Sequence, residues 1–86
     1  MPSRINSMEP AFGTQEERRK FLDHLVKEMR FTQQDISQKS RYGIDTVKAW
    51  FSENEARRRA IPDRAMALLL QSTNTSEEAF RQIIGR

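Results

Sequence analysis

Cysteine is absent from this chain of 86 residues, and histidine, tryptophan and tyrosine occur once each. Disulfide bonds and thiolate metal sites are therefore excluded, and one histidine cannot build a metal centre by itself. No apolar run approaches the roughly 20 residues of a membrane-spanning helix. Glycine and proline are scarce, with three residues each, and alternating runs of β-branched residues are rare. This composition favours a single all-α domain with no membrane attachment.

Recognisable catalytic motifs are missing as well. The chain has no glycine-rich phosphate loop, no cysteine nucleophile and no histidine–carboxylate pair at a motif spacing. Most serines and acidic residues stand at expected helix caps and turns, where a structural role accounts for them. We therefore expect a protein that is not an enzyme and that holds no cofactor and no metal.

The positive charge is concentrated in the middle of the sequence. The formal net charge is +3 at pH 7, and the charges within the segments 1–29 and 61–86 balance. The segment 30–60 holds the whole excess, with seven basic against four acidic side chains. The basic residues are Arg30, Lys39, Arg41, Lys48, Arg57, Arg58 and Arg59. Clustered positive charge of this kind is typical of a surface that binds nucleic-acid phosphates.

Capping signals and apolar spacing predict five helices. The first begins after Thr14, where Glu17 stands three residues on and completes a capping box. The second begins at Thr32, where Asp35 completes a similar cap. An apolar stripe at helical spacing follows the first cap: Phe21, Leu22, Leu25, Val26 and Met29. Three basic residues precede this stripe, either as a solvated face or as phosphate contacts: Arg18, Arg19 and Lys20.

The later helices are separated by recognisable breaks. The third is expected over 44–52 and is followed by an arginine-rich connection. Pro62 is expected at the first position of the fourth helix. The residues STNTS at 72–76 end that helix, and Ser76 then caps a short fifth helix. Residues 1–13 are turn-forming residues without periodicity, and we expect them to form a flexible arm.

The segment 31–52 carries the most informative pattern. A capped short helix is followed by a turn containing glycine and by a second helix that ends near a tryptophan. In a small basic protein, two such helices can place the second one in the major groove of DNA. The inner face of the pair is predicted to comprise Ile36, Val47 and Trp50. Trp50 is therefore expected in the core and not as a stacking platform for bases.

Residues 32–51 resemble the helix-turn-helix of the lambda-repressor and Cro family of phage, plasmid and bacterial regulators. The resemblance rests on the spacing from Thr32 to Trp50 and on the matching positions Thr32-Gln33, Ile36-Ser37, Val47 and Trp50. The resemblance covers about residues 15–71 and implies the compact five-helix fold of that family, with a helix-turn-helix DNA-binding domain at 14–71 and the last helix within 72–86. It also implies a sequence-specific transcriptional regulator of phage or plasmid type. Such a regulator is expected to be a cytoplasmic repressor that binds a palindromic operator on double-stranded DNA as a homodimer.

The resemblance and the expected helix faces together indicate the DNA contacts. Base edges are expected to meet the outward side of the third helix, at Ile44, Asp45, Thr46, Lys48 and Ala49. The phosphate backbone is expected to meet residues that flank the two helices: Gln33, Arg41, Tyr42, Ser52, Arg57, Arg58 and Arg59. Gln33 is assigned by the resemblance, at the start of the second helix, where free backbone N–H groups favour a phosphate.

Alternatives remain open at the turn. The family usually has glycine where this chain has Arg41, because the residue there is left-handed. In the usual register Gly43 caps the next helix. In a shifted register Gly43 is left-handed, Ile44 points inward and Asp45 caps a shorter helix. Tyr42 is either a contact to the DNA backbone or a partly buried packing residue.

The C-terminal segment 72–86 is a possible dimerisation element. The candidate dimer surface comprises Leu70, Phe80, Ile83 and Ile84. The alternative is that these side chains only cover the core. A second class of function is an antitoxin-like or adaptor protein, whose C-terminal helix binds a protein partner.

Overall fold

The computed structural model describes residues 12–85, and all regular structure in this range is α-helical. The helices are α1 (Gln15–Glu28), α2 (Gln33–Ser40), α3 (Ile44–Phe51), α4 (Asp63–Ser72) and α5 (Glu77–Ile83). The predicted all-α class and the predicted order of helices are confirmed. None of these helices combines the length and the apolar character needed to cross a lipid bilayer.

Phe12 and Gly13, the last two residues of the predicted arm, contact the rest of the described chain. Residues 1–11 of the predicted arm 1–13 lie outside the described residues. Gly13 is buried, and Phe12 packs against the core. The guanidinium of Arg18 also lies over the Phe12 ring, 5.9 Å from its centroid. The folded part therefore includes Phe12 and Gly13.

Side-chain caps fix the beginnings of three helices. Thr14 Oγ1 accepts the Glu17 N–H at 3.1 Å, and Glu17 Oε1 accepts the Thr14 N–H at 2.9 Å. This is the predicted capping box, and Thr32 and Asp35 form a second one at α2. Ser76 caps α5 through its hydroxyl, as predicted. Local signals therefore account for where these helices begin.

Pro62 precedes α4 and does not open it. Its φ of −75° and ψ of 157° are extended, and the helix begins at Asp63. The Pro62 carbonyl accepts the Met66 N–H at 3.2 Å. The predicted first helical position is therefore wrong by one residue, because the extended ψ makes Pro62 the cap of the helix.

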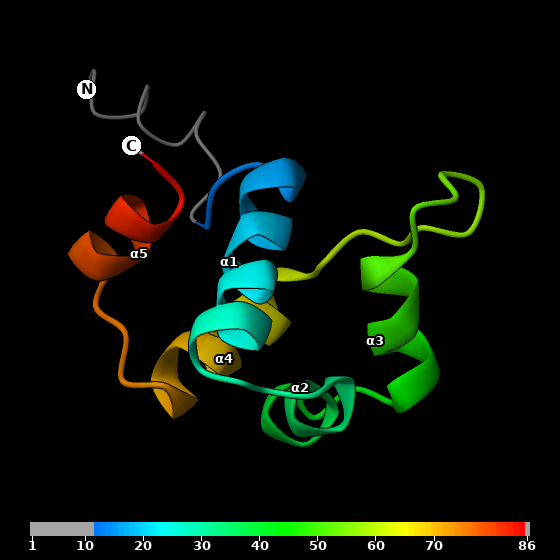
Figure 1. Cartoon of the computed structure of the whole chain (residues 1–86), viewed down its shortest axis with the longest axis horizontal. Coiled ribbons are helices and arrows are strands. Elements are labelled where there is room, and N and C mark those ends of the chain that lie inside the picture. Colours follow the sequence, from blue (N-terminus) through cyan, green and yellow to red (C-terminus); the bar gives the residue numbers. More distant parts are fainter. Residues whose placement is uncertain (1–11, 86) are drawn as a thin grey trace, which may run out of the picture.

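The core draws on all five helices and on Ile61, which lies between helices. The buried apolar side chains are Phe21, Leu22, Leu25, Ile36, Val47, Trp50, Ile61, Ala65, Met66, Leu69, Phe80 and Ile84. α2 packs against both α3 and α4, and α1 packs against α5. Figure 1 shows α1 and α4 near the centre, with α5 on one side and α3 on the other. α3 therefore lies at the edge of the molecule.

Hydrogen bonds and one ion pair of Arg18 and Gln15, here called the clasp, join the start of α1 to the end of the connection that follows α3. Arg18 is 5% exposed. Its Nε donates to the Gly13 carbonyl at 3.1 Å and its Nη1 to the Ile61 carbonyl at 2.6 Å. Its Nη2 pairs with Asp63 at 2.8 Å, while the Gln15 side chain bonds both the N–H and the carbonyl of Ile61. Neither predicted alternative holds for Arg18, because its guanidinium is buried against backbone carbonyls.

We expect Arg18→Met to destabilise the fold by about 3 kcal/mol, because the substitution leaves the Gly13 carbonyl without its side-chain donor and the Ile61 carbonyl with only the donor from Gln15. The matched change Asp63→Asn should cost less than about 1 kcal/mol, because an exposed ion pair contributes little; the Asp63 side chain is 68% exposed. Urea unfolding followed by circular dichroism measures both losses. Equal losses of unfolding free energy for the two variants would contradict the larger contribution that we assign to the buried hydrogen bonds of Arg18.

Candidate nucleic-acid interface

The turn between α2 and α3 spans residues 41–43. Arg41 has φ 64° and ψ 28°, in the left-handed region, and Gly43 has φ −63° and ψ 155° as the cap of α3. The usual register therefore holds, and the shifted turn is wrong. Ile44 and Asp45 belong to the first turn of α3. Figure 1 shows α2 nearly end-on and α3 lengthwise, so their axes cross steeply.

Two serine hydroxyls hold this turn. Ser37 Oγ donates to the Tyr42 carbonyl at 2.6 Å, and Ser40 Oγ accepts the Tyr42 N–H at 3.4 Å. Ser40 is fully buried, and the Arg41 N–H donates to the Ser37 carbonyl at 3.0 Å. These bonds offset the cost of a left-handed arginine, on the order of 1–2 kcal/mol. The sequence analysis named Ser37 only as a position that matches the helix-turn-helix, and it missed Ser40. The one available signal was the position of two serines just before a turn.

The inner face of α3 is anchored by Val47 and Trp50, which are fully buried. The prediction that Trp50 belongs to the core is confirmed. The Tyr42 ring lies against the indole, with the ring centroids 5.4 Å apart, and is partly buried. Tyr42 is therefore a packing residue, as one of the two alternatives predicted. Within residues 12–85 the indole Nε1 of Trp50 has no hydrogen-bond partner.

The outer side of α3 is polar and carries both signs of charge. Asp45 and Lys48 are exposed, and neither makes an ion pair within the described part of the chain. Thr46 and Ala49 are half-buried. Ile44 is half-buried too, because helical spacing places it toward the inner side of α3. Of the five residues predicted to meet base edges, Asp45 and Lys48 are therefore the most accessible.

The N-terminus of α2 offers backbone donors next to a polar side chain. Thr32 Oγ1 accepts the Asp35 N–H at 3.1 Å, so the backbone N–H of the third helical residue has a hydrogen-bond partner. The N–H groups of Gln33 and Gln34 come first in the helix and have no intrahelical acceptor. The Gln33 side chain is half-buried at this end. The arrangement favours an anion, because the helix dipole adds to the free donors.

The connection after α3 contains three consecutive arginines with different environments. Arg57 and Arg59 are exposed, whereas Arg58 is half-buried. Arg58 Nε donates to the Ser52 carbonyl at 2.9 Å and holds the connection against the end of α3. The Ser52 hydroxyl accepts the Asn54 N–H at 3.1 Å. Among the predicted backbone contacts in this segment, Arg57 and Arg59 are therefore the freest to meet a phosphate.

The predicted dimer surface is only partly available. Phe80 is 4% exposed and Ile84 is 3% exposed, so both belong to the core of the single chain. The Phe80 ring meets the Phe21 ring edge-on, with centroids 5.4 Å apart. Leu70 and Ile83 pack against the core but remain partly exposed. Covering the core, the alternative stated for these residues, therefore accounts for Phe80 and Ile84.

None of the protein-family models, curated proteins or solved structures compared with this chain matches it. The resemblance to the lambda-repressor and Cro family thus rests on the residues of the segment 32–51. The function of the chain has to follow from the contacts, burial and charges of its described residues.

We expect Arg41→Gly to stabilise the protein by about 1 kcal/mol, because glycine adopts the left-handed conformation without a steric cost. Arg41→Gln removes the same charge but keeps the Cβ atom, so it should bring no such gain. Chemical denaturation of the two variants beside the parent protein measures the difference. A gain that is the same for glycine and glutamine would show that charge and not backbone strain is responsible.

We expect the free energy of unfolding to decrease in acid, because the Asp35 carboxylate becomes protonated. Hydrogen bonds from the backbone and side chain of Thr32 lower the pKa of Asp35 from its ordinary value of 3.8. A lowered pKa in the folded state stabilises the protein above pH 3.8, and this contribution is lost as the pH falls through the lowered pKa. The difference in unfolding free energy between the parent and Asp35→Asn should therefore shrink below pH 3.8. A difference that stays constant down to pH 2 would show that the ionised Asp35 side chain does not stabilise the start of α2.

Proposed function

We propose that this protein binds double-stranded DNA sequence-specifically and represses transcription by occupying an operator. One observation carries the proposal. α3 is anchored by the buried Val47 and Trp50, while its opposite side stays polar and exposed at the edge of the molecule. A helix held in this way can enter the major groove, which is wide enough to admit one. A cytoplasmic location, a phage or plasmid type of regulator and a lambda-repressor-like fold are parts of the same proposal.

The outer side of α3 supplies chemistry for reading bases. Lys48 can donate to the O6 and N7 atoms of guanine, and Asp45 can accept from the amino group of cytosine. Ala49 and the exposed part of Ile44 can pack on thymine methyl groups. Thr46 can either donate or accept a hydrogen bond. Because Lys48 and Asp45 are both exposed, they are the residues that set the preferred sequence.

The segments on each side of α3 supply contacts to the phosphate backbone. At α2 these are the Gln33 side chain and the free N–H groups of the first turn. In the turn, Arg41 is exposed, and beyond α3 so are Arg57 and Arg59. Such contacts add affinity and fix the register of α3 in the groove without reading sequence.

A single chain of this size reads about half of a typical operator, so we propose that it acts as a homodimer on a palindrome. Leu70 and Ile83 are the members of the predicted dimer surface that keep exposed area. The adaptor alternative is weakened, because Phe80 of α5 and Ile84 directly after it belong to the core of their own chain.

The proposal is tested by selecting bound sites from a randomised duplex library at near-physiological salt. We expect an enriched palindrome whose half-sites are centred about one helical turn apart. No enrichment, together with binding that weakens steeply as salt rises, would indicate backbone contact alone and would contradict sequence-specific repression.

Two substitutions separate base reading from backbone contact on the selected site. Lys48→Ala should cost about 1–3 kcal/mol there and relax the preference at one base pair. Arg57→Ala should weaken binding to every sequence alike and lower the salt slope by about one. Fluorescence anisotropy on selected and random duplexes measures both effects. If Lys48→Ala weakens the two duplexes equally, Lys48 does not read a base.

A further inference from the structure

A groove of about 430 Å³ lies between α1 and α3, on the inner side of the proposed reading helix. It is lined by Glu16, Arg19, Lys20, Leu22, Asp23, Trp50, Phe51 and Arg58. Its volume falls within the range of about 300–1,000 Å³ found for sites that bind small molecules. The groove plays no part in the proposed contacts to DNA bases, which come from the opposite side of α3.

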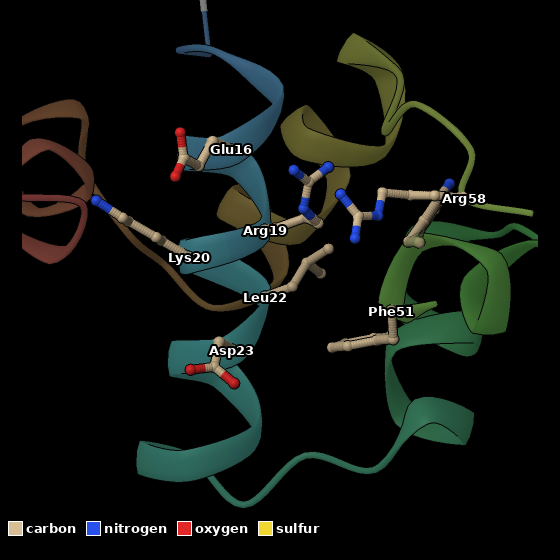
Figure 2. A pocket seen from close by; sticks show the side chains of 8 residues that line it. Glu16, Arg19, Lys20, Leu22, Asp23, Phe51 and Arg58 are labelled. Carbon is tan, nitrogen blue, oxygen red and sulfur yellow. The ribbon is translucent and has the colours of Figure 1, made fainter. Parts of the chain in front are cut away.

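Two guanidinium groups converge at one end of this groove. Figure 2 shows Arg19 of α1 and Arg58 of the connection after α3 pointing toward one another, while Lys20 points away. The Arg19 side chain has no hydrogen bond or ion pair with any residue between 12 and 85, and the Arg58 side chain bonds only backbone carbonyls. Two like charges that face each other without an acid between them favour an anion in the gap. The guanidinium fork suits the two oxygens of a carboxylate.

Three of the other six lining residues are apolar. Leu22 and Phe51 point toward one another across the groove below the two arginines (Figure 2). Leu22 is fully buried, and Phe51 is half-buried. Trp50 also lines the groove, and its buried Nε1 has no acceptor within the described residues. Phe51 is therefore the apolar lining residue with exposed surface that the body of a ligand can cover, in addition to the charges that attract an anionic head.

The flanking acids limit the charge that the groove can take. Glu16 and Asp23 lie on either side of Arg19 along α1 (Figure 2). A phosphodiester chain that ran along the groove would meet these carboxylates, whereas a single anionic group between Arg19 and Arg58 would not. The surroundings thus favour one negative charge on an apolar molecule over a polyanion.

We propose that this groove binds a small organic monocarboxylate with an apolar body. The carboxylate lies between Arg19 and Arg58, and the body lies on the exposed part of Phe51, next to the buried Leu22 and Trp50. Because Trp50 and Phe51 belong to α3, the bound molecule bridges α1 and the proposed reading helix.

The test is a titration of the full-length, ¹⁵N-labelled protein with 3-phenylpropionate, without DNA, so its result is independent of the proposed function. We expect saturable shifts of the Trp50 indole N–H and of the backbone amides at Arg19, Phe51 and Arg58. Two matched probes isolate the head and the body: the uncharged 3-phenylpropionamide and inorganic phosphate. Each should bind about tenfold more weakly, because each lacks one half of the interaction.

Variants assign the binding to the groove. Arg19→Gln should weaken 3-phenylpropionate about tenfold and leave the fold intact, because Arg19 makes no bond that the fold requires. Arg57→Gln removes the same charge outside the groove and should change nothing. No saturable shift, or equal affinity for the amide, would overturn the proposal. Phosphate that binds as tightly as 3-phenylpropionate would overturn it too, by showing a plain oxyanion site of the kind that a DNA backbone could occupy.

Discussion

The burial of Trp50 is the interaction on which the rest of the structure depends. α3 has eight residues, and a helix this short is not stable in water by itself. It is held by the fully buried Val47 and Trp50, and its main helical neighbour is α2. The indole therefore decides both where α3 lies and which of its sides remains open. Any surface for DNA on the outer side of α3 depends on a side chain that faces away from the DNA.

Polar contacts on both sides of α3 keep this arrangement in place. Before the helix, Ser37 and Ser40 hold the turn through the backbone of Tyr42. After it, Arg58 holds the start of the connection, and Arg18 with Gln15 holds its end at Ile61. These contacts go mostly to backbone atoms, so they fix the path of the chain while Asp45 and Lys48 stay free. The same path leaves the groove between α1 and α3 open to solvent.

The sequence predicted what is local and missed what depends on tertiary contacts. Caps at Thr14, Thr32 and Ser76 were predictable, because each involves residues within one helical turn.

Arg18 could not be distinguished from Arg19, since only the packing of residues 61–63 against α1 buries one and leaves the other beside the groove. The predicted helical position of Pro62 was wrong by one residue, because local signals predict that a helix exists more reliably than where it begins. The register of the turn at Arg41 was undecided although its supporting bonds are local, because the bonds from Ser37 and Ser40 to the Tyr42 backbone were not anticipated. Val47 and Trp50 were predicted as the inner side of α3, whereas Ile44 was placed on the outward side although its helical spacing with Val47 turns it partly inward.

The central claim is that the outer side of α3 and the start of α2 together form the surface that meets DNA. The most direct measurement is the change in backbone amide shifts of ¹⁵N-labelled protein on adding a selected duplex. The account predicts the largest changes at Gln33, Asp45, Lys48 and Arg57, with α5 nearly unchanged. Changes concentrated in α5 and absent from α3 would contradict it.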